Sequence, residues 1–287
     1  MRVCIIGGTG FIGYNVTLES QKRGHTVTIL GRHPPQPDHL FAPDVTIIQG
    51  DYLQMSDDAL RDLLANQQAV IFAVRFDETG LHKIPAYDSF YRPHVLGCER
   101  IFRIAREQGA QRGVIIGSYF TYFNRIWPDL RLTQHHPYMR ARQEQADVSL
   151  AAAAPSMDLM ILEMPYIMGI VPGRVPQWAS LIRYVNSSLP LWFTAGGTNM
   201  IAVSHVSEAI VGAIEKGKGG EWYTIGERNV TWATFLSDIS RQLGRNKRVI
   251  TIPTPIVRTI GWGLHGSYVV RRKERGLDPA SYMRLQT

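Results

Sequence analysis

The stretch Ile5-Ile6-Gly7-Gly8-Thr9-Gly10-Phe11-Ile12-Gly13 decides the fold of this chain. An apolar run from Val3 to Ile6 predicts a buried strand, and a helical pattern follows from Phe11 to about Arg23. A strand that leads through a glycine loop into a helix is the turn with which α/β sheets bind the pyrophosphate of a dinucleotide. Three glycines alone would be weak evidence, but their position directly after an N-terminal strand makes the motif specific.

Each glycine of the loop has a physical role. Gly7 permits the tight turn, Gly10 lets the backbone approach a pyrophosphate, and Gly13 lets the helix pack close to the strand. The bare amide groups and the dipole at the start of the helix favour phosphate. We therefore expect the loop to contact a dinucleotide cofactor through Gly7, Thr9, Gly10, Phe11, Ile12 and Gly13.

Strands and helices alternate along the first part of the chain. Further apolar runs predict strands over 25–30, 45–48, 69–74, 114–117 and 158–162, and helical patterns cover 57–65, 93–108 and 138–153. Such alternation predicts an α/β fold with a Rossmann-type doubly wound parallel sheet. We expect residues 1–170 to form this domain, with 200–230 returning to it, and residues 171–287 to form mostly a smaller C-terminal substrate-binding region. Loops are expected over 33–43 and 119–137, and the last twenty residues show no clear periodicity.

Ligands of a doubly wound sheet bind at the carboxyl ends of its strands. Arg32 follows the second strand, and no Asp or Glu occurs from Thr28 through Pro37. An acidic residue there would hold the 2′-hydroxyl of NAD, whereas Arg accommodates the 2′-phosphate of NADP. We therefore expect NADP(H) to be preferred, with NAD(H) as the alternative. Asp51 is placed to accept a hydrogen bond from the adenine amino group, and the same edge adds Tyr52, Ala73 and Val74 to the expected cofactor contacts.

The composition fits a globular protein with a full core, because 45% of the 287 residues are hydrophobic and 19% are charged. No apolar run approaches the length of a membrane span, and no signal peptide is recognisable. The two cysteines, Cys4 and Cys98, make no disulfide framework, which favours a reducing, cytoplasmic compartment. The net charge of +7 suits an anionic cofactor. The basic run Arg271–Arg275 can bind nucleic acid or anionic lipid, but such runs are more often solvated, so a nucleic-acid partner is not expected.

The motifs resemble, in their order, those of the extended short-chain dehydrogenases/reductases, the group that contains NAD-dependent epimerases/dehydratases and dihydroflavonol-type reductases. The glycine loop resembles the nucleotide loop of that family, and Gly50-Asp51 resembles its adenine-contacting pair. Val114–Ser118 resembles the strand that carries its catalytic Ser, and Pro137-Tyr138 resembles the start of its catalytic Tyr helix. Pro165–Gly169 resembles the segment that holds the nicotinamide carboxamide, which adds Pro165, Tyr166 and Ile167 to the expected contacts.

The resemblance implies hydride transfer, with Tyr138 exchanging the proton of the substrate oxygen and Ser118 hydrogen-bonding the same oxygen. A free tyrosine has a pKa of about 10, so it needs a neighbouring positive charge to act near neutrality. The family supplies a Lys one helical turn later, where this chain has Arg142. Arg142 can lower the tyrosine pKa by its charge, but an arginine does not readily release a proton. The chain also departs from the family pattern at His94, where Asn is usual, and at Glu163, where Arg is frequent.

Three functions stay open on the sequence. The first is an NADP(H)-dependent oxidoreductase of the epimerase/dehydratase or dihydroflavonol-reductase type that acts on a carbonyl or hydroxyl of a small organic or sugar substrate. The second is a non-catalytic dinucleotide-binding sensor or scaffold, suggested by the missing Lys. The third is an RNA-binding relative, suggested by the basic run.

Other features are less informative. His135 and His136 could assist proton transfer or line a loop. No His, Cys, Asp or Glu cluster has metal-ligand spacing, so no metal is expected. The sequence leaves a homodimer open.

Overall fold

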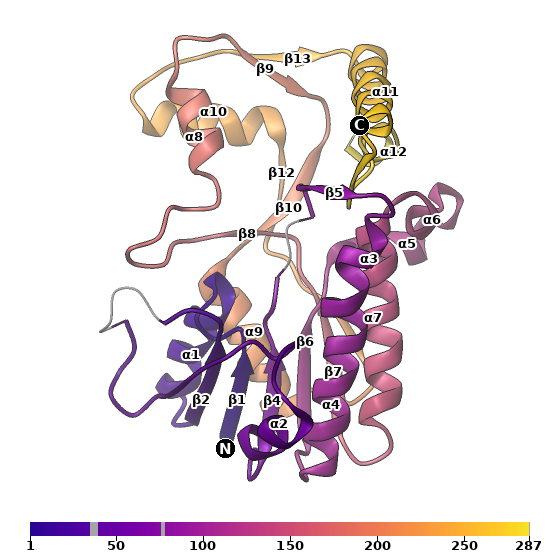
Figure 1. The fold of residues 1–287 in the computed structure, drawn as a ribbon. Coiled ribbons are helices and arrows are strands. Elements are labelled where there is room, and N and C mark those ends of the chain that lie inside the picture. Colours follow the sequence, from indigo (N-terminus) through magenta and orange to yellow (C-terminus); the bar gives the residue numbers. More distant parts are fainter. Residues whose placement is uncertain (35–39, 76–77, 287) are drawn as a thin grey trace.

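The computed structural model describes residues 1–34, 40–75 and 78–286 (Figure 1). Its centre is a seven-stranded sheet in the order β11-β7-β6-β4-β1-β2-β3, whose neighbouring strands pair in parallel. The strands are β1 (Arg2–Ile6), β2 (Thr26–Gly31), β3 (Thr46–Gln49), β4 (Ala69–Phe72), β6 (Arg112–Ile116), β7 (Asp158–Glu163) and β11 (Trp222–Thr224). The predicted doubly wound parallel sheet is therefore confirmed, and the glycine loop follows a strand that has neighbours on both sides.

Helices cover both faces of this sheet, which is why its strands are apolar throughout. Val3 and Ile5 of β1 pack on one face against α1 (Phe11–Lys22) and α9 (Val203–Lys216). Cys4 and Ile6 pack on the other face, which is covered by α2 (Asp57–Leu64), α4 (Gly97–Glu107) and α7 (Pro137–Ala153). Both cysteines are free and buried.

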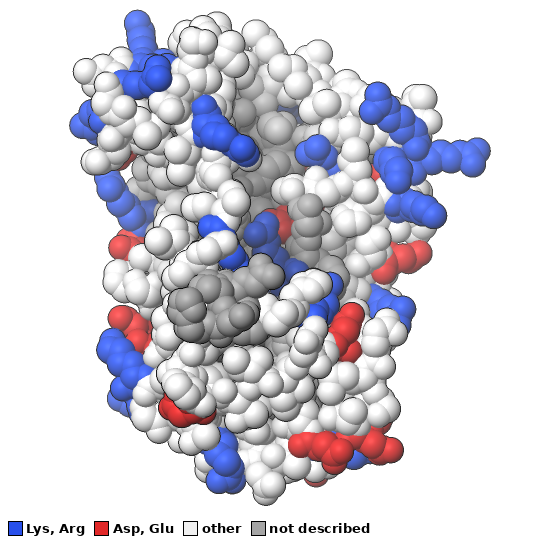
Figure 2. Space-filling model, turned by 60° about the vertical axis from the view of Figure 1, so that its left-hand side comes forward, with Lys and Arg blue, Asp and Glu red and all other residues white. Residues whose placement is uncertain are grey.

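A smaller region lies beyond the carboxyl ends of the strands (Figure 1). One part is a three-stranded sheet of β8 (Tyr166–Met168), β10 (Gly197–Ala202) and β12 (Arg228–Thr231). A second part pairs β9 (Leu191–Thr194) with β13 (Val249–Ile252), accompanied by α8 (Ala179–Asn186) and α10 (Trp232–Gln242). A third part contains α11 (Thr254–Val270), α12 (Pro279–Gln286) and the pair β5 (Leu81–Lys83) and β14 (Lys273–Arg275). Figure 2 shows that Lys and Arg side chains gather over this upper part of the molecule.

The expectation of a loop over 119–137 is wrong. This stretch forms α5 (Tyr119–Ile126), the 3₁₀ turn η2 (Pro128–Leu130) and α6 (Leu132–His135). The Ser118 side chain caps α5 by accepting a hydrogen bond from the Phe120 N–H at 3.4 Å, and α5 buries Tyr119, Phe120 and Thr121. A serine cap and buried aromatic residues stabilise a short helix that periodicity alone does not reveal.

The helix predicted to begin near Pro93 begins earlier. Its course runs from α3 (Tyr87–Phe90) through a π-helical segment, η1 (Tyr91–Leu96), into α4. Pro93 therefore lies inside a helical segment, where the wider turn accommodates a residue that has no N–H to donate. The last twenty residues, which show no periodicity, form β14 and α12. Part of the loop expected over 33–43 lies outside the described residues.

Candidate active site

A cavity of about 680 Å³ lies at the carboxyl ends of β1, β2, β4, β6 and β7. It brings together most of the side chains and loops that the sequence singles out. The predicted site residues that line it are Gly7, Thr9, Gly10, Phe11, Ile12, Arg32, Tyr52, Ala73, Val74, Ser118, Tyr138, Arg142, Pro165, Tyr166 and Ile167. Gly13 and Asp51 are not among its lining residues.

The glycine loop has the tight geometry that its sequence demands. Gly7 has a φ of +87°, a conformation that side-chain-bearing residues rarely adopt, and its N–H donates to the Leu30 carbonyl at 2.8 Å. A Cβ on Gly13 would lie 2.2 Å from the Gly7 carbonyl oxygen, so Gly13 serves the close packing of α1. Gly10 precedes α1 and offers no side-chain cap to its amide groups. The start of α1 is therefore built to receive an acceptor from a ligand.

One side of the cavity is formed by the ends of β2 and β3. Arg32 is exposed immediately after β2 and lines the cavity. The Asp51 carboxylate accepts a hydrogen bond from the Leu53 N–H at 3.0 Å and thereby shapes the turn after β3. Tyr52 is buried, and its hydroxyl donates to the Pro93 carbonyl at 2.9 Å. Tyr52 thus contributes a wall of the cavity, while its polar atom is used within the protein.

Ser118 and Tyr138 both line the cavity. Ser118 ends the segment after β6, and Tyr138 is the second residue of α7. Tyr138 is only 8% exposed, and its ring packs edge-on against Phe90 and His94 with centroid distances of 5.7 and 6.1 Å. Burial raises the pKa of Tyr138 above its usual value, while the charge of Arg142 and a hydrogen bond with Ser118 lower it. The balance keeps the phenol protonated at neutral pH.

Arg142 is a buried cation, 6% exposed, one helical turn after Tyr138. Its Nη1 donates to the Gln145 Oε1 at 2.7 Å and to the His94 Nδ1 at 3.2 Å, and its Nη2 donates to the Ile116 carbonyl. Its guanidinium carbon lies 5.8 Å from the centroid of the Tyr138 ring. These hydrogen bonds hold the Arg142 guanidinium over the Tyr138 ring, where its positive charge acts on the phenol.

His94 completes this arrangement as a neutral side chain. Arginine only donates, so the hydrogen bond from Arg142 requires an unprotonated Nδ1 on His94. Burial lowers the pKa of His94 well below its usual value, and the charge of Arg142 lowers it further. His94 lies in the π-helical segment η1. The two residues that replace the family's Asn and Lys, His94 and Arg142, are therefore hydrogen-bonded to each other.

Glu163, the other departure, is completely buried at the end of β7 and does not line the cavity. Its two oxygens accept from the two terminal nitrogens of Arg125, each at 2.7 Å. They also accept from the hydroxyls of Thr121 at 2.6 Å and Thr224 at 2.7 Å. Arg125 in turn lies over the Trp222 ring at 4.7 Å. Glu163 thus ties α5 and β11 to β7, and through Thr121 it holds the segment that carries Ser118.

The aromatic content of residues 119–137 and of the region after Pro172 predicts that both regions line the pocket, and aromatic residues of both regions do line the cavity. Trp178, Leu277 and Tyr282 line it from the smaller region, together with Tyr119 and Phe120. The Tyr282 hydroxyl lies 2.9 Å from that of Tyr166, which joins α12 to β8. The aromatic content of these segments was the available signal, but nothing local indicates that residue 282 returns to the strand ends.

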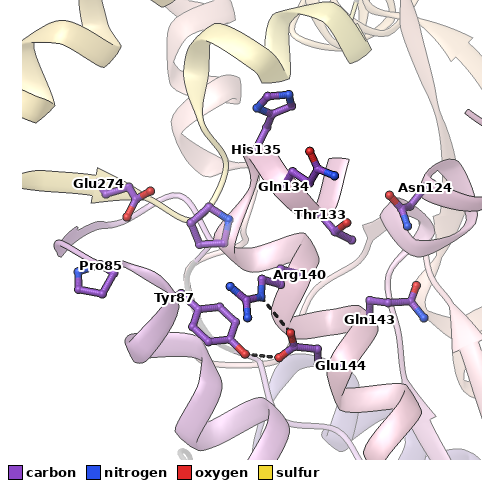
Figure 3. A pocket seen from close by; sticks show the side chains of 11 residues that line it. Pro85, Tyr87, Asn124, Thr133, Gln134, His135, Arg140, Gln143, Glu144 and Glu274 are labelled. Carbon is purple, nitrogen blue, oxygen red and sulfur yellow. Dashed lines mark hydrogen bonds and ion pairs between the residues drawn. The ribbon is translucent and has the colours of Figure 1, made fainter. Parts of the chain in front are cut away.

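A second cavity, of about 540 Å³, opens on the outer side of α7 and shares no lining residue with the first. In Figure 3, Arg140 and Tyr87 both point to the Glu144 carboxylate, and His135 lies at the rim. His136 is buried, and its Nδ1 accepts from the Asp278 N–H at 3.0 Å, while burial lowers its pKa to about 4. Neither histidine lines the main cavity, so a role in proton transfer is not supported. No group of three His, Cys, Asp or Glu within 1–34, 40–75 and 78–286 could hold a metal ion.

Comparisons with known proteins show which proteins this chain resembles. The model of the NAD(P)H-binding family matches residues 7–168. The 4-hydroxy-2-methyl-3-oxo-4-farnesyl-3,4-dihydroquinoline-1-oxide ketoreductase of Stigmatella aurantiaca is 25% identical, over 99% of this chain and 86% of its own length. The decarboxylating sterol-4-alpha-carboxylate 3-dehydrogenase of Mus musculus is 24% identical, over 83% of this chain and 67% of its own length. No helix in the described part of the chain is long and apolar enough to cross a membrane.

A solved structure shows the same fold. MoeE5 in complex with UDP-glucuronic acid and NAD has a TM-score of 0.68 at 19% identity, with coverage of 88% of this chain and 85% of that one. The family match spans the glycine loop, the Ser118 strand and the Tyr138 helix, and the relatives are a reductase and a dehydrogenase. The chain therefore belongs to the NAD(P)H-binding family, and its relatives group it with the extended short-chain dehydrogenases/reductases of the NAD-dependent epimerase family.

Proposed function

We propose that this protein uses NADP(H) to reduce a carbonyl group, or to oxidise the corresponding hydroxyl, on a substrate with a ring or an extended apolar group. The observation that carries the proposal is that Ser118 and Tyr138 line the same cavity as the glycine loop. Tyr119, Tyr166 and Trp178 give that cavity aromatic walls. The substrate of the Stigmatella aurantiaca relative, a farnesyl-bearing quinoline, is of this chemical kind.

The residues present fit a dinucleotide. The start of α1 has no side-chain cap, Gly10 has no side chain to block a phosphate, and Arg32 stands at the adenosine end. Pro165 and Ile167 would border the nicotinamide. When bound, NADPH supplies the hydride that reduces the carbonyl carbon.

The chain's own residues would handle the proton. Ser118 would donate a hydrogen bond to the substrate oxygen, and Tyr138, protonated at neutral pH, would donate the proton that this oxygen gains. The resulting phenolate would be stabilised by the charge of Arg142 and would recover its proton from water. Because Arg142 keeps its proton, it acts through its charge and takes no part in a relay.

Neutralising this charge is expected to shift the pH dependence. Arg142 lowers the pKa of Tyr138, so in Arg142→Gln that pKa rises further. Alcohol oxidation, which needs the phenolate as base, should then slow at pH 8 and become fast only at more alkaline pH. Reduction, which needs the protonated phenol, should keep its activity to higher pH. The pH profiles of kcat/KM in both directions measure this, with Arg142→Lys as the control that retains the charge.

An Arg142→Gln profile that coincides with that of the wild type would contradict the electrostatic role. A higher turnover in Arg142→Lys than in the wild type would show that the natural Arg slows the reaction. Thermal unfolding of both variants should accompany the kinetics, because Arg142 also joins α7 to the end of β6.

Arg32 is expected to select NADP(H). Hydrogen bonds to a charged group contribute about 1.5–3 kcal/mol, so Arg32→Ala should weaken NADPH binding roughly 10- to 150-fold. Binding of NADH should change little, since NADH has no 2′-phosphate. Fluorescence titration of both nucleotides measures this, and Arg61→Ala, an exposed arginine on α2, is the control. Equal losses for NADPH and NADH would contradict the selection.

The function itself is tested by NADPH consumption with a panel of aromatic and prenylated ketones. Turnover with at least one compound supports the proposal. The competing function is a dinucleotide sensor without chemistry, and it is favoured by one observation: both terminal nitrogens of Arg142 already bond protein atoms. Tight NADPH binding without turnover across the panel would favour the sensor.

A further inference from the structure

The helix α11 has a face that no part of the described chain covers. Its inner side packs on α12, where a Cβ on Gly261 would lie 2.9 Å from the Pro279 carbonyl. Its outer side exposes large apolar residues: Ile260 is 52%, Trp262 65% and Val270 85% exposed. A helix that is apolar all round is normally buried on all sides, in a protein core or in a membrane. In α11 only one side is buried.

The exposed residues form one broad surface. Ile256 and Ile260 are four residues apart and lie on the same side of the helix, and Trp262 and Val269 lie along its opposite flank. Gly263 and Gly266 stand between the flanks, and an added Cβ at either would meet no other atom within 4 Å. Among Asp, Glu, Lys and Arg, only Arg258 occurs in this helix. The outer face of α11 is therefore largely an apolar strip, interrupted by the exposed hydroxyl residues Thr259 and Ser267.

The sequence around this strip is strongly basic. From Ile239 to Lys273 there is no Asp or Glu. The same stretch contains Arg241, Arg245, Lys247, Arg248, Arg258, Arg271, Arg272 and Lys273. Arg271 and Arg272 are exposed at the end of α11, and α11 and β13 both lie in the upper part of the molecule, where the Lys and Arg side chains gather (Figures 1 and 2).

We propose that α11 is a membrane-docking helix, which lies in the surface of a bilayer of anionic phospholipids. Its exposed Ile, Val and Trp side chains would enter the boundary between headgroups and acyl chains, and the flanking arginines would bind the phosphates. A second copy of the chain fits less well, because a twofold interface would bring the basic stretch against itself. Nucleic acid would neutralise the arginines but would leave Ile260 and Trp262 in water.

The cavity lies close behind this helix. Leu277 and Tyr282, which line the cavity, belong to the segment that packs under α11. A membrane-bound orientation would hold that side of the cavity near the lipid, where apolar substrates concentrate. The docking itself does not depend on the proposed activity.

The test is co-sedimentation of the full chain with vesicles of phosphatidylcholine and phosphatidylglycerol in equal parts. We expect binding that is lost with pure phosphatidylcholine vesicles and weakened by high salt. Ile260→Glu/Trp262→Glu should reduce partitioning at least tenfold, and Arg271→Gln/Arg272→Gln should reduce it about tenfold or more. Two matched controls should bind like the wild type: Leu18→Glu/Trp127→Glu, exposed apolar residues elsewhere, and Lys216→Gln/Lys218→Gln, cations near the amino end of β11.

Three results would overturn the proposal. Wild-type protein that stays in solution with the anionic vesicles contradicts it directly. Binding that falls equally in the α11 variants and their controls shows that another face or general charge is responsible. A dimer in analytical ultracentrifugation that Ile260→Glu/Trp262→Glu dissociates, without vesicle binding, would assign the strip to a second copy.

Discussion

Replacing Tyr138 by Phe is expected to lower kcat for carbonyl reduction by about two to four orders of magnitude, the usual contribution of a positioned proton donor. The change removes one oxygen and keeps the ring that packs against Phe90 and His94. The affinity for NADPH should stay the same, because the proposed cofactor contacts lie elsewhere. Steady-state kinetics with any substrate found in the ketone panel, together with a NADPH titration, measure both quantities.

Tyr119→Phe is the matched control for this experiment. Tyr119 is as buried as Tyr138, lines the same cavity and has no assigned role in proton transfer. Its kcat should fall within a few fold of the wild-type value. If Tyr138→Phe turns over like the wild type, Tyr138 does not donate the proton.

Removing the partner of the buried carboxylate is expected to produce the largest loss of stability. Arg125→Ala leaves the fully buried Glu163 carboxylate with the hydroxyls of Thr121 and Thr224 as hydrogen-bond donors among the described residues. Breaking a fully buried pair costs about 3–5 kcal/mol in the free energy of unfolding, and we expect the lower end of this range because the Arg125 side chain itself is exposed. Because Thr121 lies beside Ser118, the turnover of any protein that remains folded should fall as well. Chemical denaturation measures the change in stability.

Two comparisons distinguish the pair of the buried Glu163 and the exposed Arg125 from a pair of two surface charges. Arg140→Ala breaks an exposed pair with Glu144 and should cost less than about 1 kcal/mol. The double variant Arg125→Met/Glu163→Met removes both charges and should recover much of the stability that Arg125→Ala loses. A loss below about 1 kcal/mol for Arg125→Ala would mean that water reaches the Glu163 carboxylate.

The sheet and the nucleotide loop were predictable because their signals are local. A parallel strand buried on both faces must be apolar, as Val3–Ile6 is, and a close approach of α1 to β1 must have Gly13, since a Cβ there would lie 2.2 Å from the Gly7 oxygen. Gly13 was also expected to contact the cofactor, but it does not line the cavity, and its lack of a side chain allows the close packing of α1 against the glycine loop. Asp51 was expected to accept a hydrogen bond from the adenine amino group; one of its carboxylate oxygens accepts from the Leu53 N–H, and the adenine contact stays a prediction.

The rest of the site depends on contacts between distant residues, which one sequence does not show. Tyr282 reaches the cavity only because α12 returns to β8, and Glu163 is understood only once Arg125 is placed beside it. The same holds for Arg142: the sequence gives its distance from Tyr138 along the helix, but only the structure shows that its side chain is hydrogen-bonded to His94 and to the Ile116 carbonyl. The prediction of a loop after Ser118 was wrong because α5 is stabilised by a serine cap and by buried aromatic residues, and neither produces a helical periodicity in the sequence.

Calorimetric titration of the wild-type protein with NADP⁺ and NAD⁺ tests the central claim most directly. The cavity, the uncapped start of α1 and Arg32 predict one site per chain, with NADP⁺ bound more tightly than NAD⁺, and the same NADP⁺ affinity in Arg142→Lys. Heat changes absent for both nucleotides would contradict the account, since the fold would then lack the cofactor on which every proposed step depends.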